Sequence, residues 1–263
     1  TSALILALKT LNVHSAHEVI LPTYVCRSVL DAVHAVGATP VLCDVGHEWT
    51  ATEENIAPLI SERTGAIIAV HIFGLPMDIE LIKKFHVPVI EDACQAFGAT
   101  DREKKLGTVA DIGVFSFHAT KCLTTAEGGM LAFADPELAS RSRILNCSCP
   151  MSDLSAVLGV SQIARYEDFL KIRRQLSTEY SSFFSDSAFD GVMAPPKRDF
   201  YFRYALRTNR PPSELINAFK QMGIMVRRGV DALLHRMLGL RDTLFPNAVE
   251  LYNSTISLPF YPS

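Results

Sequence analysis

Residues 18–45, EVILPTYVCRSVLDAVHAVGATPVLCDV, decide the fold class of this 263-residue chain. They hold a short apolar strand at 18–21 that Pro22 ends, an amphipathic helix at 27–36 and a second apolar strand at 40–44. Short apolar strands that alternate with amphipathic helices are typical of a mostly parallel sheet with both faces covered. The stretch therefore predicts an α/β fold.

The same alternation continues on both sides of this stretch, up to Asp92. The expected elements are a helix at 3–12, a helix at 53–61, a strand at 66–72, a helix at 78–85 and a strand at 87–91. After Asp92 the rhythm changes, because two strands at 112–117 and 129–134 flank a polar segment that carries Lys121.

The C-terminal part of the sequence predicts a second, smaller domain. A long amphipathic helix is expected at about 152–184, and the Pro-rich, polar residues 190–199 mark a domain boundary. We therefore expect a large domain over 1–189 and a small α+β domain over 190–263. The small domain should contain a strand at 200–207, a helix at 213–222, an extended piece near 224–228 and a helix at 247–253. Both ends look cut, so we expect the chain to be part of a longer protein and the small domain to be truncated.

Composition excludes some classes of function. The formal net charge of -3 argues against a protein whose main task is binding nucleic acid. No stretch approaches the roughly 20 apolar residues of a membrane span, and no signal peptide opens the chain. The cysteines form no disulfide framework and no complete zinc motif, so we expect no metal site and reduced, mostly buried thiols in a cytoplasmic protein. They are Cys26, Cys43, Cys94, Cys122, Cys147 and Cys149.

Two candidate functional residues follow strands. Ligands of open α/β sheets lie beyond the carboxyl ends of parallel strands, and Asp92 lies at such an end. It could pair with a ligand cation, although capping the next helix is the commoner role for an Asp there. Lys121 alone would be a solvated surface lysine, but the small, hydroxylated and flexible residues at 122–129 (CLTTAEGG) suit the floor of a tight pocket.

A third candidate feature is the start of the chain. Thr1 and Ser2 directly precede a helix, where hydroxyls and free backbone N–H groups can bind an anion, although an ordinary helix cap is equally compatible. A phosphate cradle, a carboxylate and a lysine are together the protein groups that pyridoxal 5'-phosphate (PLP) requires.

Two segments closely resemble the DegT/DnrJ/EryC1/StrS aminotransferases, which are PLP enzymes of fold type I: EDACQAFGAT (91–100) and ADIGVFSFHATKCLTTAEGGML (110–131). The similarity extends over nearly the whole chain, through residues 1–8, 18–45, 69–82, 151–174 and 256–263. The resemblance implies a three-layer PLP-transferase fold with a mostly parallel central sheet and a homodimer that builds its site at the interface.

The resemblance also implies a role for each candidate residue. Lys121 holds the cofactor covalently and then shuttles protons as general acid and base. Asp92 pairs with the protonated pyridine nitrogen, and Gln95 hydrogen-bonds the 3′-oxygen of the ring. The cofactor phosphate is held by Thr1, Ser2 and Ser116.

This sequence departs from the family pattern near the cofactor. Many members stack an aromatic ring on the cofactor where this chain has Cys26, with Tyr24 nearby, and a thiol can make only a weaker contact. The run Ser148-Cys149-Pro150-Met151 replaces an Asn-Tyr-Arg-Met run that supplies a phosphate contact to the neighbouring subunit. His235 corresponds to a histidine near the active-site mouth, although an ordinary surface or capping role is equally compatible.

The function implied is transfer of an amino group, from L-glutamate, to a nucleotide-linked keto-deoxysugar. A PLP-dependent sugar dehydratase is a second possibility, but that variant replaces the cofactor lysine with histidine, and this chain keeps Lys121. A third possibility is a degenerate, non-catalytic protein that binds a ligand or regulates, suggested by the changes at residues 26 and 148–150.

Overall fold

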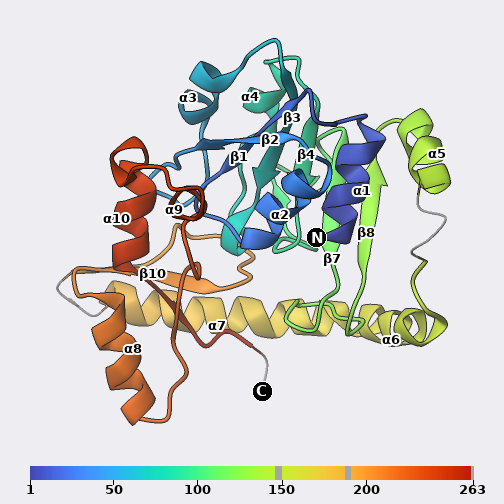
Figure 1. Cartoon of the computed structure of the whole chain (residues 1–263). Helices are drawn as coiled ribbons and strands as arrows, with labels where there is room; N and C mark the ends of the chain where they lie inside the picture. The colour runs from blue at the N-terminus through green and yellow to red at the C-terminus, as the bar shows by residue number, and fades with distance from the viewer. Residues whose placement is uncertain (146–149, 187–190, 262–263) are drawn as a thin grey trace.

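The computed structural model describes residues 1–145, 150–186 and 191–261. Within these ranges the main sheet has six strands in the order β2-β1-β3-β4-β7-β8 (Figure 1). They are β1 (Glu18–Pro22), β2 (Thr39–Cys43), β3 (Thr64–Val70), β4 (Val89–Asp92), β7 (Ile112–Ser116) and β8 (Gly129–Phe133). Neighbouring strands are parallel except β8, which runs antiparallel to β7. The carboxyl ends of β1, β4 and β7 therefore meet at one edge of the sheet.

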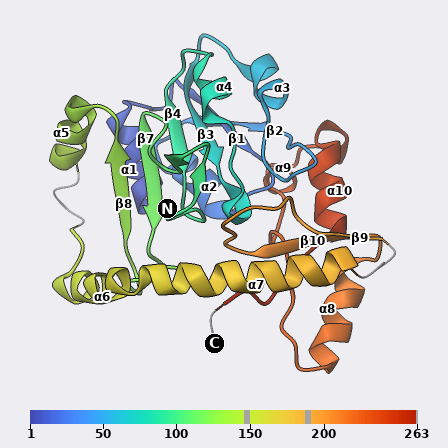
Figure 2. The same ribbon diagram turned by 180° about the vertical axis from the view of Figure 1, so that it is seen from behind.

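Helices cover the faces of this sheet. The helices of this part are α1 (Ser2–Thr10), α2 (Arg27–Ala35), α3 (Glu53–Ile56), α4 (Ile79–Lys83) and α5 (Pro136–Leu145), with 3-10 turns at Ala57–Leu59 and Ile72–Gly74. In Figure 1, α1 and α2 lie in front of the strands, and in Figure 2 they lie behind them. Every residue of β1 and β4 is buried, as expected for parallel strands covered on both faces.

The long helix expected at 152–184 is two helices, so that prediction was wrong in this detail. α6 (Asp153–Ala164) ends at Arg165, and α7 (Tyr166–Asp186) begins directly after it. In both views α7 runs below the main sheet (Figures 1 and 2). It joins the two parts of the molecule, because the buried guanidinium of Arg173 donates to backbone carbonyls of Tyr201 and Phe202 at 3.2 Å.

A second, antiparallel sheet has the strand order β11-β12-β10-β9 within the described chain. Its strands are β9 (Val192–Met193), β10 (Tyr204–Thr208), β11 (Arg227–Arg228) and β12 (Thr255–Leu258), and its helices are α8 (Pro212–Gln221), α9 (Leu234–Met237) and α10 (Pro246–Ser254), with a 3-10 turn at Asp242–Leu244. A small ribbon pairs β5 (Thr100–Asp101) with β6 (Lys104–Lys105). Residues 187–190 lie outside the described residues, so the boundary between residues 189 and 190 stays a prediction.

The mostly parallel main sheet and the small C-terminal α+β part confirm the predicted fold class. Several elements were not predicted, namely α5, α9, β9, β12 and the β5–β6 ribbon. The strand expected at 200–207 begins only at Tyr204, because Phe200 and Phe202 pack instead into a separate hydrophobic cluster against α7.

The thiols are less buried than expected. Among the described cysteines Cys43 is buried, Cys94 and Cys122 are half-buried and Cys26 is exposed, so the expectation of mostly buried thiols fails clearly only for Cys26. Cys147 and Cys149 lie outside the described residues. The described residues contain no cluster of His, Cys, Asp and Glu that could hold a metal ion. None of the helices in the described ranges has both the length and the apolar character that crossing a bilayer requires.

Candidate active site

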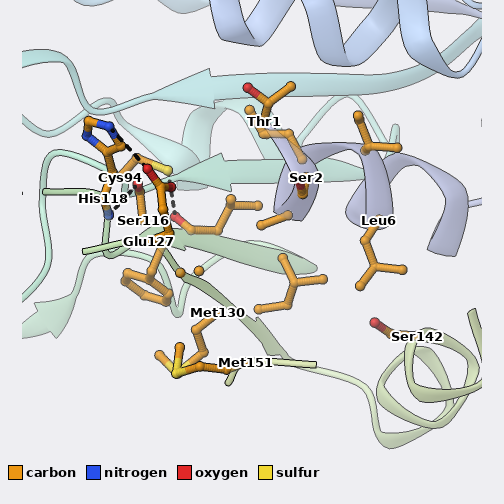
Figure 3. Close-up of a pocket in the computed structure, with 18 of the residues that line it drawn as sticks. Thr1, Ser2, Leu6, Cys94, Ser116, His118, Glu127, Met130, Ser142 and Met151 are labelled. Atoms are coloured by element: carbon orange, nitrogen blue, oxygen red, sulfur yellow. Dashed lines mark hydrogen bonds and ion pairs between the residues drawn. The ribbon is translucent and has the colours of Figure 1, made fainter. Parts of the chain in front are cut away.

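A cavity of about 1280 Å³ opens at the carboxyl edge of the main sheet, beside the start of α1. Residues that were predicted from distant parts of the sequence line it together: Thr1, Ser2, Cys26, Ser116 and Lys121. Asp92 and Gln95 are not among the lining residues, but they lie two residues before and one residue after Cys94, which lines the cavity. Figure 3 shows Thr1 and Ser2 on one side, and Cys94, Ser116 and His118 on the other.

The Asp92 carboxylate is the buried acid of this region. Asp92 ends β4 between Val70 and Val114 and is only 5% exposed. Its Oδ1 accepts a hydrogen bond from the Cys94 backbone N–H at 3.0 Å. The residues that follow form turns, so the carboxylate caps a turn rather than a helix. No Lys, Arg or His of the described chain lies within ion-pair distance of it, and a buried carboxylate without a cation favours a positively charged ligand group.

The Cys94 thiol is not a second negative charge that could bind a positively charged ligand group. Its thiol donates to the Val114 carbonyl at 3.8 Å. Burial, together with the neighbouring Asp92 carboxylate, raises the pKa of Cys94 well above its usual range. The group therefore stays a neutral thiol, which is a poor nucleophile.

Lys121 lies on an anchored loop and not on a free surface. It is half-buried, and its backbone N–H donates to the His118 carbonyl at 2.9 Å. The loop is fixed by Phe117 and Leu123, whose side chains belong to the hydrophobic cluster against α7. The ammonium nitrogen lies 5.1 Å from the centroid of the Phe202 ring. A lysine on an ordinary exposed loop has no such anchoring contacts, so Lys121 is not an ordinary surface lysine.

Gln95 is oriented by the backbone. Its Oε1 accepts from the Phe73 N–H at 2.7 Å, and because a backbone N–H can only donate, the oxygen must point there. The amide nitrogen is thereby left as the donor. Phe73 has φ of 58°, an uncommon backbone conformation for a residue with a side chain, and its carbonyl accepts from the Phe202 N–H at 2.7 Å.

The start of α1 is arranged as an anion site. Thr1 occupies the cap position, but its side chain makes no capping hydrogen bond, so its hydroxyl is available to a ligand. The first N–H groups of the helix have no partner within it, and the helix dipole favours negative charge there. A Cβ at Gly129 would meet the Phe115 carbonyl at 3.0 Å and Ala3 at 3.4 Å, so Gly129 lets α1 approach β8 closely.

The residues that depart from the family pattern lie in different surroundings. Cys26 is the exposed residue before α2, and its sulfur accepts from the Ser28 hydroxyl at 3.2 Å. Tyr24 is fully buried with its ring against Phe73 and is not among the residues that line the cavity. Ser148 and Cys149 lie outside the described residues, whereas Pro150 and Met151 line the cavity.

His235 is neither a surface residue nor part of the cavity lining. It is fully buried, and its ring nitrogens lie 2.8 Å from Thr23 Oγ1 and 3.0 Å from Asp242 Oδ1. The ring stacks on Phe245 at 4.4 Å. Because Thr23 directly follows β1, His235 joins the carboxyl end of that strand to the C-terminal part of the chain.

One network beneath the site was missed by sequence reasoning. Glu91 and His71 are both fully buried, with His71 Nε2 at 2.8 Å from Glu91 Oε1. His71 Nδ1 accepts from the Met77 N–H at 3.0 Å, so the ring proton is on Nε2 and donates to the carboxylate. The carboxylate also accepts backbone hydrogen bonds from Gly107, Val109 and Ala110 at 2.6 to 3.1 Å. A charged residue inside an apolar strand was the available signal, and the network fixes the strand end that carries Asp92.

Replacing Glu91 with Gln is expected to lower the free energy of unfolding by about 2–4 kcal/mol at pH 7, because the new NH₂ group faces hydrogen-bond donors. Burial alone raises the pKa of Glu91, but the hydrogen bonds from His71 and the backbone outweigh it, so the pKa lies below its usual range. A depressed carboxyl pKa stabilises the fold above the unfolded value of about 4.3 and loses that effect as the pH falls through the folded value.

Urea unfolding at several pH values measures this effect. The difference in the free energy of unfolding between wild type and Glu91→Gln should become smaller below about pH 4. Glu62→Gln, at an exposed position, should have the free energy of unfolding of wild type at every pH. Equal stability of Glu91→Gln and wild type at pH 7 would contradict the importance of the network.

The donor set around the cavity fits PLP. The cofactor needs a lysine for its aldehyde and an acid for its ring nitrogen; Lys121 lines the cavity, and the buried Asp92 lies two residues before Cys94, which also lines it. Its phosphate needs donors, which Thr1, Ser2 and the start of α1 provide. The oriented Gln95 amide offers a donor to the remaining ring oxygen.

The sequence is similar to that of known proteins. The model of the DegT/DnrJ/EryC1/StrS aminotransferase family matches residues 1–263. The spore coat polysaccharide biosynthesis protein SpsC of Bacillus subtilis is 30% identical over 100% of this chain and 79% of its own length. GDP-perosamine synthase of Escherichia coli O157:H7 is 33% identical over 68% of this chain and 55% of its own length.

The fold agrees with solved structures as well. The PLP form of the sugar aminotransferase Spr1654 from Streptococcus pneumoniae, itself described as putative, superposes with a TM-score of 0.90 at 25% identity. The match covers 99% of this chain and 80% of that one. The chain therefore belongs to the DegT/DnrJ/EryC1/StrS family of PLP-dependent sugar aminotransferases.

Proposed function

We propose that this protein binds PLP and transfers an amino group from L-glutamate to a nucleotide-linked keto-deoxysugar. The observation that carries the proposal is the meeting of Lys121 and the start of α1 in one cavity, with the buried Asp92 carboxylate beside it. The relatives support the substrate class, since one of them is a GDP-perosamine synthase. A cytoplasmic location is part of the proposal, and the free thiols of the described cysteines support it.

Each residue has a defined task in this proposal. When bound, PLP supplies an electron sink for the exchange of an amino group. The Lys121 amine holds the cofactor and then moves a proton at the carbon that carries the transferred nitrogen. Asp92 keeps the ring nitrogen protonated, and the Gln95 amide donates to the ring oxygen. The phosphate is held by Thr1, Ser2 and Ser116 together with the N–H groups at the start of α1.

The position of Lys121 favours a transferase over the dehydratase alternative. In that alternative a histidine would take the place of Lys121, and the nearest candidate in sequence is His118. Its ring is engaged elsewhere, with Nδ1 at 2.9 Å from Thr120 Oγ1 and Nε2 at 3.6 Å from the Glu127 carboxylate.

The transfer is tested by mixing the holoprotein with L-glutamate and then with a panel of nucleotide ketosugars. Glutamate should convert the cofactor to its aminated form, with loss of its absorbance band, and one class of ketosugar should restore the band and become aminated. A colourless protein that ignores added PLP would contradict the proposal and favour the non-catalytic alternative.

We also propose a homodimer that uses α6. This helix exposes an apolar stripe at helical spacing: Leu154 (86% exposed), Val157 (70%), Val160 (72%) and Ile163 (59%). Contiguous apolar surface of this kind marks a contact site. Met151, Ser152 and Ser155 of the same region line the cavity, so a second copy packed on α6 would lie next to the site.

Val160→Lys is expected to shift the protein from dimer to monomer, because it buries a charge at the centre of the apolar contact. Light scattering coupled to gel filtration measures the mass directly. Met222→Lys changes an equally exposed apolar residue outside α6 and should leave the dimer intact. A wild-type protein that is a monomer with full activity would contradict the dimer.

A further inference from the structure

Arg203 is a charged residue close to Lys121 that the proposed function does not yet use. It lies directly before β10, next to Phe202 in the chain. Its guanidinium carbon is 5.9 Å from the centroid of the Phe202 ring, and the Lys121 ammonium nitrogen is 5.1 Å from the same centroid. The two charged groups are therefore separated by no more than the sum of these distances.

The Arg203 guanidinium is poorly satisfied by the protein. Its one hydrogen bond among the described residues goes to the Gly229 carbonyl at 3.5 Å, the long limit for such a bond. Within the described chain no carboxylate lies at ion-pair distance from it. Arg207, on the following strand, shows the contrast, because it pairs with Glu250. Burial is the main cause that lowers the pKa of Arg203, yet an arginine stays charged at neutral pH.

The surroundings of Arg203 place it at the edge of the site. Arg203 donates to the Gly229 carbonyl, and Gly229 packs against the Tyr24 hydroxyl, which a Cβ at Gly229 would meet at 2.2 Å, so Arg203 lies near the turn between β1 and α2. Cys26 lines the same cavity as Lys121. Asp231 is the carboxylate that acts on the charge of Arg203, but it forms no ion pair with Arg203 among the described residues. A half-buried cation of this kind is costly unless a ligand supplies the counter-charge.

We propose that Arg203 binds an oxyanion of the substrate, either a carboxylate of the amino-acid donor or a phosphate of the nucleotide sugar. The inference rests on the proposed function. A guanidinium suits both groups, because its planar donors match two oxygens of a carboxylate or phosphate at once. Its closeness to Lys121 fits a group carried by the molecule that reacts there.

Isothermal titration calorimetry on the holoprotein tests the proposal without turnover. The probes are glutarate, a dicarboxylate without an amino group, and UDP, a nucleoside diphosphate. Arg203→Gln should bind one of the two about tenfold to a hundredfold more weakly. Weaker glutarate binding assigns the donor carboxylate, and weaker UDP binding assigns the phosphate. Arg203→Lys should fall between wild type and Arg203→Gln, because it keeps the charge but loses the planar fork.

Arg210→Gln is the matched control, since Arg210 is exposed, pairs with Glu214 and should have no effect. Unchanged affinity of Arg203→Gln for both probes, or a wild type that binds neither, would overturn the proposal. The PLP content of each protein is measured first by absorbance. A wild type that fails to take up PLP speaks against the proposed function, whereas normal PLP content with unchanged probe affinity speaks against Arg203 alone.

Discussion

Lys121→Ala is expected to lower the rate of amino-group transfer by at least about 10³-fold, because in the proposed function it removes the amine that both holds the cofactor and moves the proton. The fold should survive, since Lys121 is half-buried and the loop is anchored by Phe117 and Leu123. The measurement is the rate at which L-glutamate aminates the cofactor, followed by absorbance in a stopped-flow instrument.

Two further measurements sharpen this test. Added methylamine should restore part of the rate if Lys121 supplies a base, because a small amine can enter a cavity of this size. Lys84→Ala, at an exposed position, should leave the rate unchanged. A Lys121→Ala protein that retained a tenth of the wild-type rate would show that another group performs the proton transfer.

Asp92→Asn is expected to have the second largest effect, a loss of turnover of at least about 10²-fold. The amide oxygen can still accept from the Cys94 N–H, so the turn after β4 should be kept. What the variant loses is the negative charge that, in the proposed function, holds a proton on the ring nitrogen of the cofactor. The expected result is a folded protein that takes up PLP and turns over slowly.

This variant is judged by its PLP absorbance, its circular dichroism and its turnover together. Asp168→Asn, at an exposed position on α7, serves as the control for removal of a negative charge. Near-wild-type turnover of Asp92→Asn would show that the ring nitrogen needs no partner here. An unfolded Asp92→Asn protein would mean that the carboxylate is structural.

Much of the fold could be predicted from local pattern. The run EVILP and the strand runs around it are mostly apolar, and such runs become parallel strands buried on both faces. Asp92 interrupts that pattern at the end of β4, which made it visible as a candidate. The order of the strands, and so the meeting of Thr1 with Ser116 in one cavity, depends on crossovers that no local pattern contains.

The errors have physical causes. The break at Arg165 was invisible because helical pattern continues on both sides of it. Apolar residues such as Leu154 and Val157 have helical spacing, but spacing does not reveal whether the apolar face is covered within the chain, and here it is exposed.

Contacts that join distant parts of the chain were missed entirely. Glu91 and His71 are 20 residues apart, and they meet only because β3 and β4 are neighbours in the sheet. Lys121 lies over the ring of Phe202, which is far from it in sequence, and this contact brings Lys121 near Arg203, the next residue after Phe202. Both cases require the tertiary structure, because burial and missing counter-charges are not properties of a sequence.

Borohydride reduction of the PLP-loaded protein tests the central claim most directly. Reduction makes the bond between lysine and cofactor permanent, and peptide mass spectrometry then locates it. The account predicts one labelled peptide, with the added mass on Lys121 in the segment 110–131. A label on any other lysine, or no label on a protein that has bound PLP, would contradict the assignment of Lys121.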